Sequence, residues 1–284
     1  VSACRFVDDI IPASPYVMTA SYIERLIQDY GIDYFVHGDD PCLVDGKDVY
    51  EAAKRAGRFC TIPRTEGIST TDIVGRLLLL NQDHHKALID GSSEGVFASQ
   101  QSNFLVTAQL LRAFSGALPA QRNLEKVKVV YVDGAWDMFH MGHVSLLQKA
   151  RDLGDYVVAG VHSDSVVNQY RGSNYPIMNM QERSLSVLGC RYVDDVLLDA
   201  PWHITREMIA TLRVAVVLRG KVRDTDLSKG TDPHAVPKTL GIHVELESAE
   251  TLNVDEITER LQTRREQVRQ RHAVKEKQEQ SWYR

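Results

Sequence analysis

The chain has 284 residues, of which 43% are hydrophobic, so it can form one large folded domain or two smaller ones. A formal net charge of −5 argues against a general nucleic-acid binder and against attachment to anionic membranes. The four cysteines show no paired spacing, which favours reduced thiols in a cytoplasmic protein, and no apolar run is long enough for stable membrane insertion.

An internal repeat divides the chain. Residues 4–11 match residues 190–197, and the same offset pairs Thr19 with Thr205, so we predict two copies of one α/β unit. The predicted parts are the C-terminal part of a first domain at 1–80, a linker with a short helix at 81–126, a second domain at 127–262 and a charged helical tail at 263–284. Because the first copy lacks the opening strand of the second, we expect it to be truncated at its N-terminus and to belong to a longer protein.

The first copy is predicted to begin with a short strand that ends near Ile11, an amphipathic helix at 22–30 and a short buried strand at 34–36. Ligands bind beyond the carboxyl ends of strands in open parallel sheets. The residues that follow this strand are therefore candidates for binding: His37, Gly38, Asp39 and Asp40. A turn capped by an aspartate is the alternative for the two carboxylates.

A helix at 48–57 and a strand at 58–62 lead to a second polar stretch, which opens a helix predicted from about 72 to 80. An arginine next to the free amides of a helix start is an anion site, although a well-capped helix alone would also explain the pattern. The candidates in this stretch are Arg64, Thr65, Gly67, Ile68, Ser69 and Thr70.

The second copy opens with the stretch that organises the chain. A β-branched strand at 127–132 ends in a turn at Gly134, and a helix then begins with His140, Gly142 and His143. Two histidines three residues apart at a helix start lie on one face, so both can contact one phosphate. The two glycines let that phosphate approach the backbone. A zinc pair or two surface histidines are the alternatives; zinc is disfavoured because no third ligand lies nearby in sequence, and no metal site is expected.

Further along, a strand at 156–161 ends near Asp164, and a helix at 165–170 is followed by Arg171. A helix at 179–188 carries Arg183, and a strand at 196–198 precedes Trp202. The forked guanidinium of an arginine suits phosphate oxygens, with a surface position as the alternative for Arg171. An indole face suits a cation, with core packing as the alternative for Trp202.

The segment HMGH at 140–143, after VYVDGAWDMF, resembles the signature of the cytidylyltransferases within the HxGH nucleotidyltransferase superfamily. Residues 174–202 are similar to a block shared by the members that act on phosphocholine and phosphoethanolamine. The resemblance implies an α/β fold of two tandem Rossmann-like HxGH domains with parallel sheets. It implies transfer of a cytidylyl group from CTP to phosphoethanolamine, giving CDP-ethanolamine and pyrophosphate, in phosphatidylethanolamine biosynthesis. The choice of phosphoethanolamine over phosphocholine rests on the two tandem units, and an adenylyltransferase is a further alternative.

The resemblance also assigns roles to residues, and it implies Mg²⁺ bound with CTP. The implied catalytic residues are His140, His143 and Arg171. Implied nucleotide contacts in the second copy are Gly134, Trp136, Gly142, Asp164 and Arg183. In the first copy they are His37, Gly38, Asp39 and the motif that resembles RTxGxST, with Arg64, Thr65, Gly67, Ile68, Ser69 and Thr70. Implied substrate contacts are Asp39, Asp40 and Trp202.

The second copy departs from the family pattern at two places. Residues 219–222 replace HGDD by RGKV, and residues 247–254 replace RTEGISTT by ESAETLNV. Glutamate near a triphosphate costs affinity by repulsion. The alternative function is therefore a non-catalytic, nucleotide-binding regulatory module in the second domain. We expect the two domains to pack together within the chain, and a homodimer is left open. The tail has a narrow apolar face, so we expect a solvated helix.

Overall fold

The computed structural model describes residues 1–39, 42–44, 47–63, 73, 76, 127–172, 175–221, 231–247 and 252–264. The chain divides into two compact units. Unit 1 comprises Val1–Asp8 and Thr70–Val268, and unit 2 comprises Asp9–Ser69 and Arg269–Arg284. The predicted linker at 81–126, Asp40, the motif at 64–70 and the tail from 265 onward lie outside the described residues. In the part of the chain that is described, no helix is both long and apolar enough to span a bilayer.

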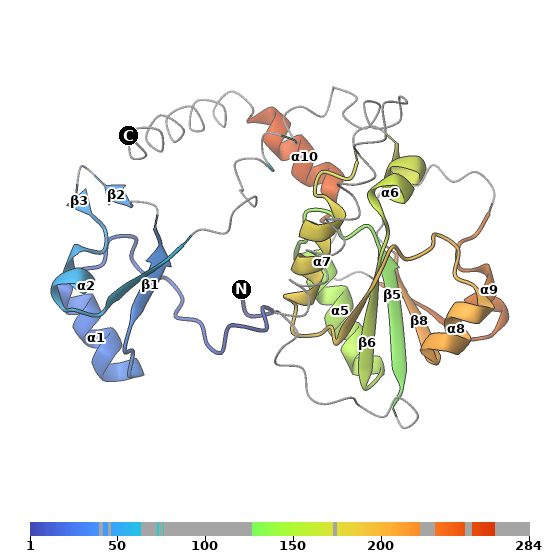
Figure 1. The fold of residues 1–284 in the computed structure, drawn as a ribbon, viewed down its shortest axis with the longest axis horizontal. Coiled ribbons are helices and arrows are strands. Elements are labelled where there is room, and N and C mark those ends of the chain that lie inside the picture. The colour runs from blue at the N-terminus through green and yellow to red at the C-terminus, as the bar shows by residue number, and fades with distance from the viewer. Residues whose placement is uncertain are drawn as a thin grey trace. The chain divides into compact units, whose positions relative to one another are not determined.

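Unit 1 contains a five-stranded sheet in the order β7-β6-β5-β8-β9, in which every neighbouring pair is parallel (Figure 1). Its strands are β5 Val129–Gly134, β6 Tyr156–Val161, β7 Asp195–Leu198, β8 Val214–Gly220 and β9 His243–Leu246. Its helices are α5 Met141–Leu153, α6 Asp164–Arg171, α7 Met180–Leu188, α8 Arg206–Leu212, α9 Ala235–Thr239 and α10 Val254–Thr263. The chain order reverses at the central strand β5, and ligands bind at such a switch point in open α/β sheets.

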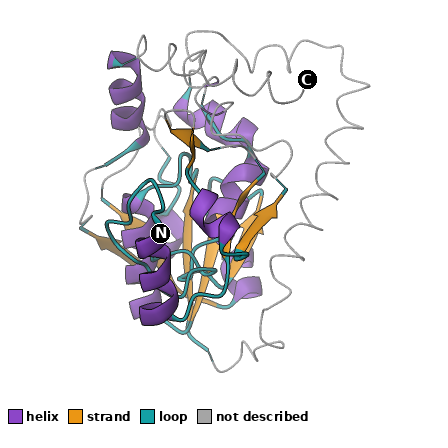
Figure 2. Cartoon of the chain, turned by 90° about the vertical axis from the view of Figure 1, so that its left-hand side faces the viewer, coloured by secondary structure: helices purple, strands orange, loops and turns teal. Residues whose placement is uncertain are grey.

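The central strand is buried on both faces because helices cover both. Val130 and Val132 pack in one cluster with Leu147 of α5, whereas the alternate residues Val129 and Tyr131 pack in a second cluster with Ile209 of α8. The alternation follows from the two-residue period of a strand. Figure 2 distinguishes the helices of the chain from its strands by colour. The predicted α/β fold with a parallel sheet is therefore confirmed for unit 1.

Unit 2 is smaller. Its elements are α1 Ala20–Tyr30, β1 Phe35–Gly38, β2 Leu43–Val44, β3 Lys47–Asp48, α2 Glu51–Arg55 and β4 Phe59–Ile62. Strands β1 and β4 pair in parallel, and α1 covers them through Ile23 and Leu26, which contact Phe35 in one cluster. The predicted strand near Ile11 is wrong, because residues 7–11 form no strand. In the second copy the equivalent strand β7 pairs with β6, and the described residues of unit 2 include no counterpart of β6.

Equivalent residues of the two copies contact each other inside unit 1. Cys4 forms an isolated antiparallel bridge with Cys190. The Arg5 guanidinium donates to the carbonyls of Cys190 and Val193. The guanidinium of Arg191, the counterpart of Arg5, donates in the same way to the carbonyls of residues 4 and 7. The contact is thus self-complementary, as across a two-fold axis.

Candidate functional site

The imidazole pair at the start of α5 is held by reciprocal hydrogen bonds. His140 is the N-cap residue, and its Nδ1 accepts a bond from the Gly142 N–H at 3.2 Å. The His143 Nδ1 accepts from the His140 N–H, also at 3.2 Å. A neutral imidazole whose Nδ1 is an acceptor carries its proton on Nε2. The helix start therefore offers two Nε2–H donors, on rings whose centroids are 3.9 Å apart.

His143 stays neutral near pH 7. Burial, assisted by the neighbouring His140 and the positive charge of Arg171, holds the pKa of His143 well below its usual value. Phe139 stacks on the His143 ring at a centroid distance of 5.5 Å, and Trp136 lies 5.3 Å from it. A neutral, sterically fixed imidazole is a hydrogen-bond donor for an anion and needs no proton from solvent.

Gly142 permits a close approach between the start of α5 and the segment that precedes α10. A Cβ on Gly142 would lie 3.0 Å from the His140 Cε1 and 3.2 Å from the Leu252 carbonyl oxygen. The Asn253 side chain accepts from the Glu256 N–H at 2.8 Å and so caps the first turn of α10. The amides of two helix starts thus lie near the imidazole pair, and both carry partial positive charge.

Arg171 is the last residue of α6 and is 7% exposed. Its guanidinium lies 4.0 Å above the Tyr175 ring and 3.4 Å from the Asp255 carboxylate on α10. The Tyr175 hydroxyl donates to the same carboxylate at 2.8 Å, and burial raises the pKa of this tyrosine to about 12. The buried positive charge of Arg171 would attract an anion to the imidazole pair, whereas the carboxylate of Asp255 would repel that anion.

The sequence model of the family described as cytidylyltransferase-like matches residues 1–76 and 131–278, which is most of the chain. The chain belongs to the cytidylyltransferase-like family. It is 39% identical to an ethanolamine-phosphate cytidylyltransferase of Arabidopsis thaliana over 307 residues, covering 100% of this chain and 72% of that protein. It is 40% identical to the ethanolamine-phosphate cytidylyltransferase of Dictyostelium discoideum over 294 residues, covering 98% and 79%. These relatives confirm the resemblance seen in the sequence.

A relative whose name gives a different substrate aligns with a shorter part of the chain. The chain is 33% identical to choline-phosphate cytidylyltransferase A of Homo sapiens over 135 residues. That match covers 46% of this chain and 36% of the human protein. The similarity to the ethanolamine-phosphate cytidylyltransferases thus extends over both copies of the repeat. The similarity to choline-phosphate cytidylyltransferase A covers less than half of the chain.

Arg183 is a predicted phosphate contact of this cytidylyltransferase-like chain, and the structure places it in the interior. Its side chain is fully buried, and its guanidinium donates to the carbonyls of Ala135, Met178 and His162 and to the Asp164 carboxylate. These contacts join the turn after β5, the end of β6 and the start of α7. The geometry favours a positioning role, and a direct phosphate contact stays a prediction.

Asp137 is a site residue that the sequence analysis missed. It is fully buried, and its carboxylate accepts from the N–H groups of Met138, Ile177 and Met178 at 3.1, 2.7 and 2.9 Å. Burial raises the pKa of Asp137, against the lowering effect of the bonds from Ile177 and Met178. An acidic residue inside the apolar run WDMF was the available signal, because buried acids need specific partners.

The aromatic candidates of unit 1 are packed against protein. Trp136 is 2% exposed, lies against Gly134 and donates from Nε1 to the Gly160 carbonyl at 2.7 Å. Trp202 is half-buried and stacks on Tyr170 at a centroid distance of 4.1 Å. Packing therefore explains the position of Trp136, while a ligand role for either tryptophan stays a prediction.

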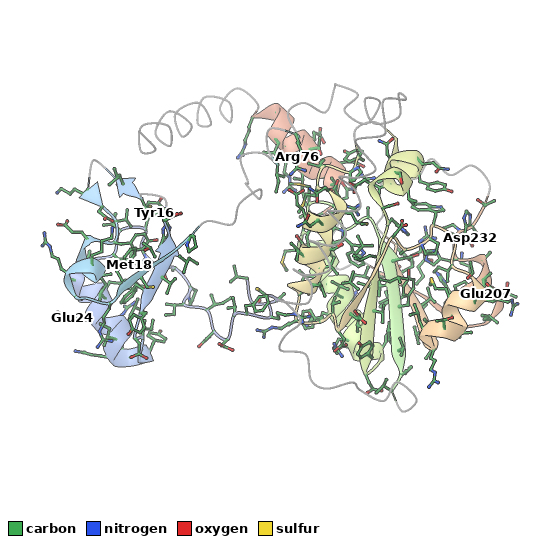
Figure 3. The ribbon with its side chains drawn as sticks, viewed as in Figure 1. Tyr16, Met18, Glu24, Arg76, Glu207 and Asp232 are labelled. Atoms are coloured by element: carbon green, nitrogen blue, oxygen red, sulfur yellow. The ribbon has the colours of Figure 1, made fainter. Side chains whose placement is uncertain are left out.

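Two side-chain pairs that the sequence analysis did not identify lie at the carboxyl end of the sheet. The His234 Nε2 is 3.1 Å from the Asp133 carboxylate at the end of β5. Burial raises the pKa of Asp133, but the hydrogen bond with His234 and the electrostatic effects of His234 and His162 together outweigh burial and hold the pKa below its usual value. Arg219 of β8 lies 3.9 Å from Asp232, which is labelled beside α9 in Figure 3.

The described candidates of unit 2 are fewer. His37 lies at the end of β1, with its Nδ1 3.1 Å from the Gly38 carbonyl and its ring 4.7 Å from that of Tyr50. Asp39 is exposed. The other first-copy candidates, Asp40 and residues 64–70, lie outside the described residues. Of the predicted set, the structure therefore brings together His140, Gly142, His143 and Arg171 around the start of α5.

Proposed function

We propose that the chain catalyses transfer of a cytidylyl group from CTP to phosphoethanolamine, giving CDP-ethanolamine and pyrophosphate in phosphatidylethanolamine biosynthesis. The supporting observation is the imidazole pair at the start of α5, with Arg171 beside it, in a chain whose relatives carry the name ethanolamine-phosphate cytidylyltransferase. His140 and His143 would donate Nε2–H bonds to α-phosphate oxygens, where negative charge develops during transfer.

The reaction needs no general base. The second pKa of a phosphate ester is about 6, so the phosphoethanolamine phosphate is largely a dianion near neutral pH. One of its oxygens attacks the α-phosphorus in line with the departing pyrophosphate, and the protein contributes positioning and charge stabilisation. In this proposal each copy of the repeat has its own site. Residues 37–40 and 64–70 contact the nucleotide and the substrate amine in the first copy, and Trp202 contacts the amine in the second copy.

Mg²⁺ belongs to the proposal through CTP. The described residues contain no group of three His, Cys, Asp or Glu side chains that could hold a metal ion. They do not offer a dedicated protein site, so we expect the ion to enter on the triphosphate oxygens.

We also propose that the two units are tandem copies of one domain. Thr19 and Thr205 cap α1 and α8 in the same way, each accepting from the N–H three residues ahead. Gly57 and Gly241 both adopt positive φ, at 65° and 69°. The proposed domain limits are 1–80 and 127–262. We also propose that the two domains pack together, and the formation of a homodimer is left open.

Product formation tests the proposed reaction directly. With radiolabelled CTP and phosphoethanolamine, we expect CDP-ethanolamine and pyrophosphate in equal amounts, and no product with ATP. A competition assay with phosphocholine tests the choice of amine. A preference for phosphocholine or for ATP would contradict the proposal.

The second candidate function is a nucleotide-binding regulatory module in unit 1 without turnover. The register that pairs Gly57 with Gly241 and Arg76 with Arg260 is shifted by one residue from the comparison of 64–71 with 247–254 above. In this register, Val254 and Asp255 stand where the first copy has Thr70 and Thr71. Val254 is fully buried, and Asp255 places a carboxylate beside Arg171. The hydroxyls that would contact phosphate are thus absent there.

Replacing the N-cap histidine of α5 separates the two candidates. If unit 1 only binds nucleotide, His140→Ala weakens CTP binding to the chain about tenfold, the equivalent of 1.4 kcal/mol, while CDP-ethanolamine formation falls less. Isothermal titration and the product assay measure the two effects on the same preparation. Equal losses in binding and turnover would assign catalysis to unit 1.

A further inference from the structure

Two thiols, one from each copy of the repeat, lie directly opposite each other in unit 1. Cys4 and Cys190 form an antiparallel bridge, and both are free thiols. The backbone N–H groups of Arg5 and Arg191 donate across this bridge on either side of the cysteines, each at 2.8 Å. Because these bonds flank the cysteines and do not join them, Cys4 and Cys190 are a non-hydrogen-bonded pair.

The backbone geometry of such a pair fits a disulfide. Opposed residues of this type have Cα atoms about 4.5 Å apart, with side chains on the same face. Disulfides occur at Cα separations of about 4.4–6.8 Å, so no backbone movement is required. The guanidiniums of Arg5 and Arg191, each bonded to carbonyls of the opposite segment, keep the two cysteines in register.

We propose that Cys4 and Cys190 are a reversible oxidation site at which the two thiols form an intrachain disulfide. The oxidant is a low-molecular-weight disulfide such as oxidised glutathione. The Cys4 thiolate attacks one sulfur of the oxidant and releases one reduced glutathione. The Cys190 thiolate then attacks the Cys4 sulfur and releases the second. The two thiols lose two protons and two electrons in total, and the oxidant accepts the electrons.

The order of the two attacks follows from exposure. Cys4 is partly exposed, whereas Cys190 is 2% exposed and is shielded from the oxidant. Burial raises the pKa of the Cys190 thiol, with a further contribution from Cys4, so its thiolate fraction is small at neutral pH. The second step should therefore accelerate as the pH rises. The bond would tie the segment that leads into unit 2 to the residues that follow α7.

Thiol mapping tests the site on the intact chain. The chain is incubated with oxidised glutathione and then unfolded in denaturant, so that the buried Cys190 is accessible to iodoacetamide. We expect two of the four thiols to be protected, and none in the untreated chain. Mass spectrometry should find a peptide pair that joins Cys4 to Cys190 and lacks two hydrogens. The non-reducing electrophoretic band should migrate faster than the reduced one, and dithiothreitol should reverse both changes.

Variants identify the pair. The double variant Cys42→Ser/Cys60→Ser should form the same disulfide, whereas Cys4→Ser should form none. Cys4 is only partly buried, so we expect the Cys4→Ser variant to fold. The thiol mapping on the unaltered chain tests the proposal independently of this variant. The proposal is overturned if oxidised glutathione leaves Cys190 reactive, if glutathione remains on Cys4, or if the linkage joins two chains.

Discussion

Replacing Asp137 should destabilise unit 1 because its carboxylate is the only acceptor the structure records for two buried N–H groups. Ile177 and Met178, the donors, are 3% and 8% exposed and donate at 2.7 and 2.9 Å. Each buried donor left without a partner costs about 1–3 kcal/mol. Removing the carboxylate also removes the cost of burying it, which is reflected in its raised pKa. We therefore expect Asp137→Ala to lower the unfolding free energy by about 2–4 kcal/mol.

A thermal unfolding experiment measures this loss. For a domain of this size, 1 kcal/mol corresponds to about 2–4 °C, so Asp137→Ala should lower Tm by roughly 5–15 °C. Asp137→Asn retains one acceptor oxygen and should lose about half as much. The control is Asp152→Asn on exposed helix surface, which should change stability by less than about 0.5 kcal/mol. If Asp137→Ala unfolds at the same temperature as this control, the carboxylate does not hold the 175–178 segment.

Three further predictions concern the start of α5. Asp255→Asn removes a negative charge 3.4 Å from Arg171 and should tighten CTP binding a few-fold, by less at high salt, as titration calorimetry at two salt concentrations would measure. Gly142→Ala should weaken CTP binding and lower Tm, because the added Cβ would lie 3.0 Å from the His140 ring and 3.2 Å from a carbonyl. The unfolded His143 takes up a proton near pH 6.5, whereas the folded one does so only at lower pH. Stability should therefore fall as the pH drops below about 6.5, and His143→Gln should reduce this slope in urea unfolding curves.

The strand, turn and helix around the imidazole pair were predictable because each depends on neighbouring residues. β-branched residues on β5 give a buried strand, and a histidine pair at a spacing of three gives one helix face. The reciprocal caps at His140 and His143 add detail to that prediction without changing it.

The supports of the site were not predictable, because they join segments far apart in the sequence. Asp137 bonds to residues 177 and 178, and Arg183 reaches back to Ala135. No periodicity or spacing encodes such pairs, since they form only when β5, β6 and α7 have assembled. Arg183 was assigned to phosphate by the family resemblance; a forked guanidinium also suits backbone carbonyls when it is buried.

The same limit applies to contacts that arise from the first copy. Arg76 forms a bidentate ion pair with Glu182 near the start of α7, at 2.7 and 2.9 Å (Figure 3). Glu182 is 6% exposed and also completes the capping box of α7 through the Asn179 N–H. One carboxylate thus joins a residue of the first copy to the helix that carries Arg183. The sequence repeat identified Arg76 as the counterpart of Arg260 and gave no reason to expect this partner.

The second candidate function, in which unit 1 binds nucleotide without turnover, has an electrostatic argument. The neutral His143 imidazole can donate a hydrogen bond to a phosphate without compensating its charge. Phosphoryl transfer needs positive charge where the equatorial oxygens become more negative, and Arg171 is the nearest described cation. Asp255 lies against that cation and would be repelled by the γ- or β-phosphate that Arg171 would attract. In this candidate, the imidazole donors would bind a nucleotide, while Asp255 would offset the positive charge of Arg171. The site would then stabilise the transition state little more than the bound nucleotide, and transfer would be slow.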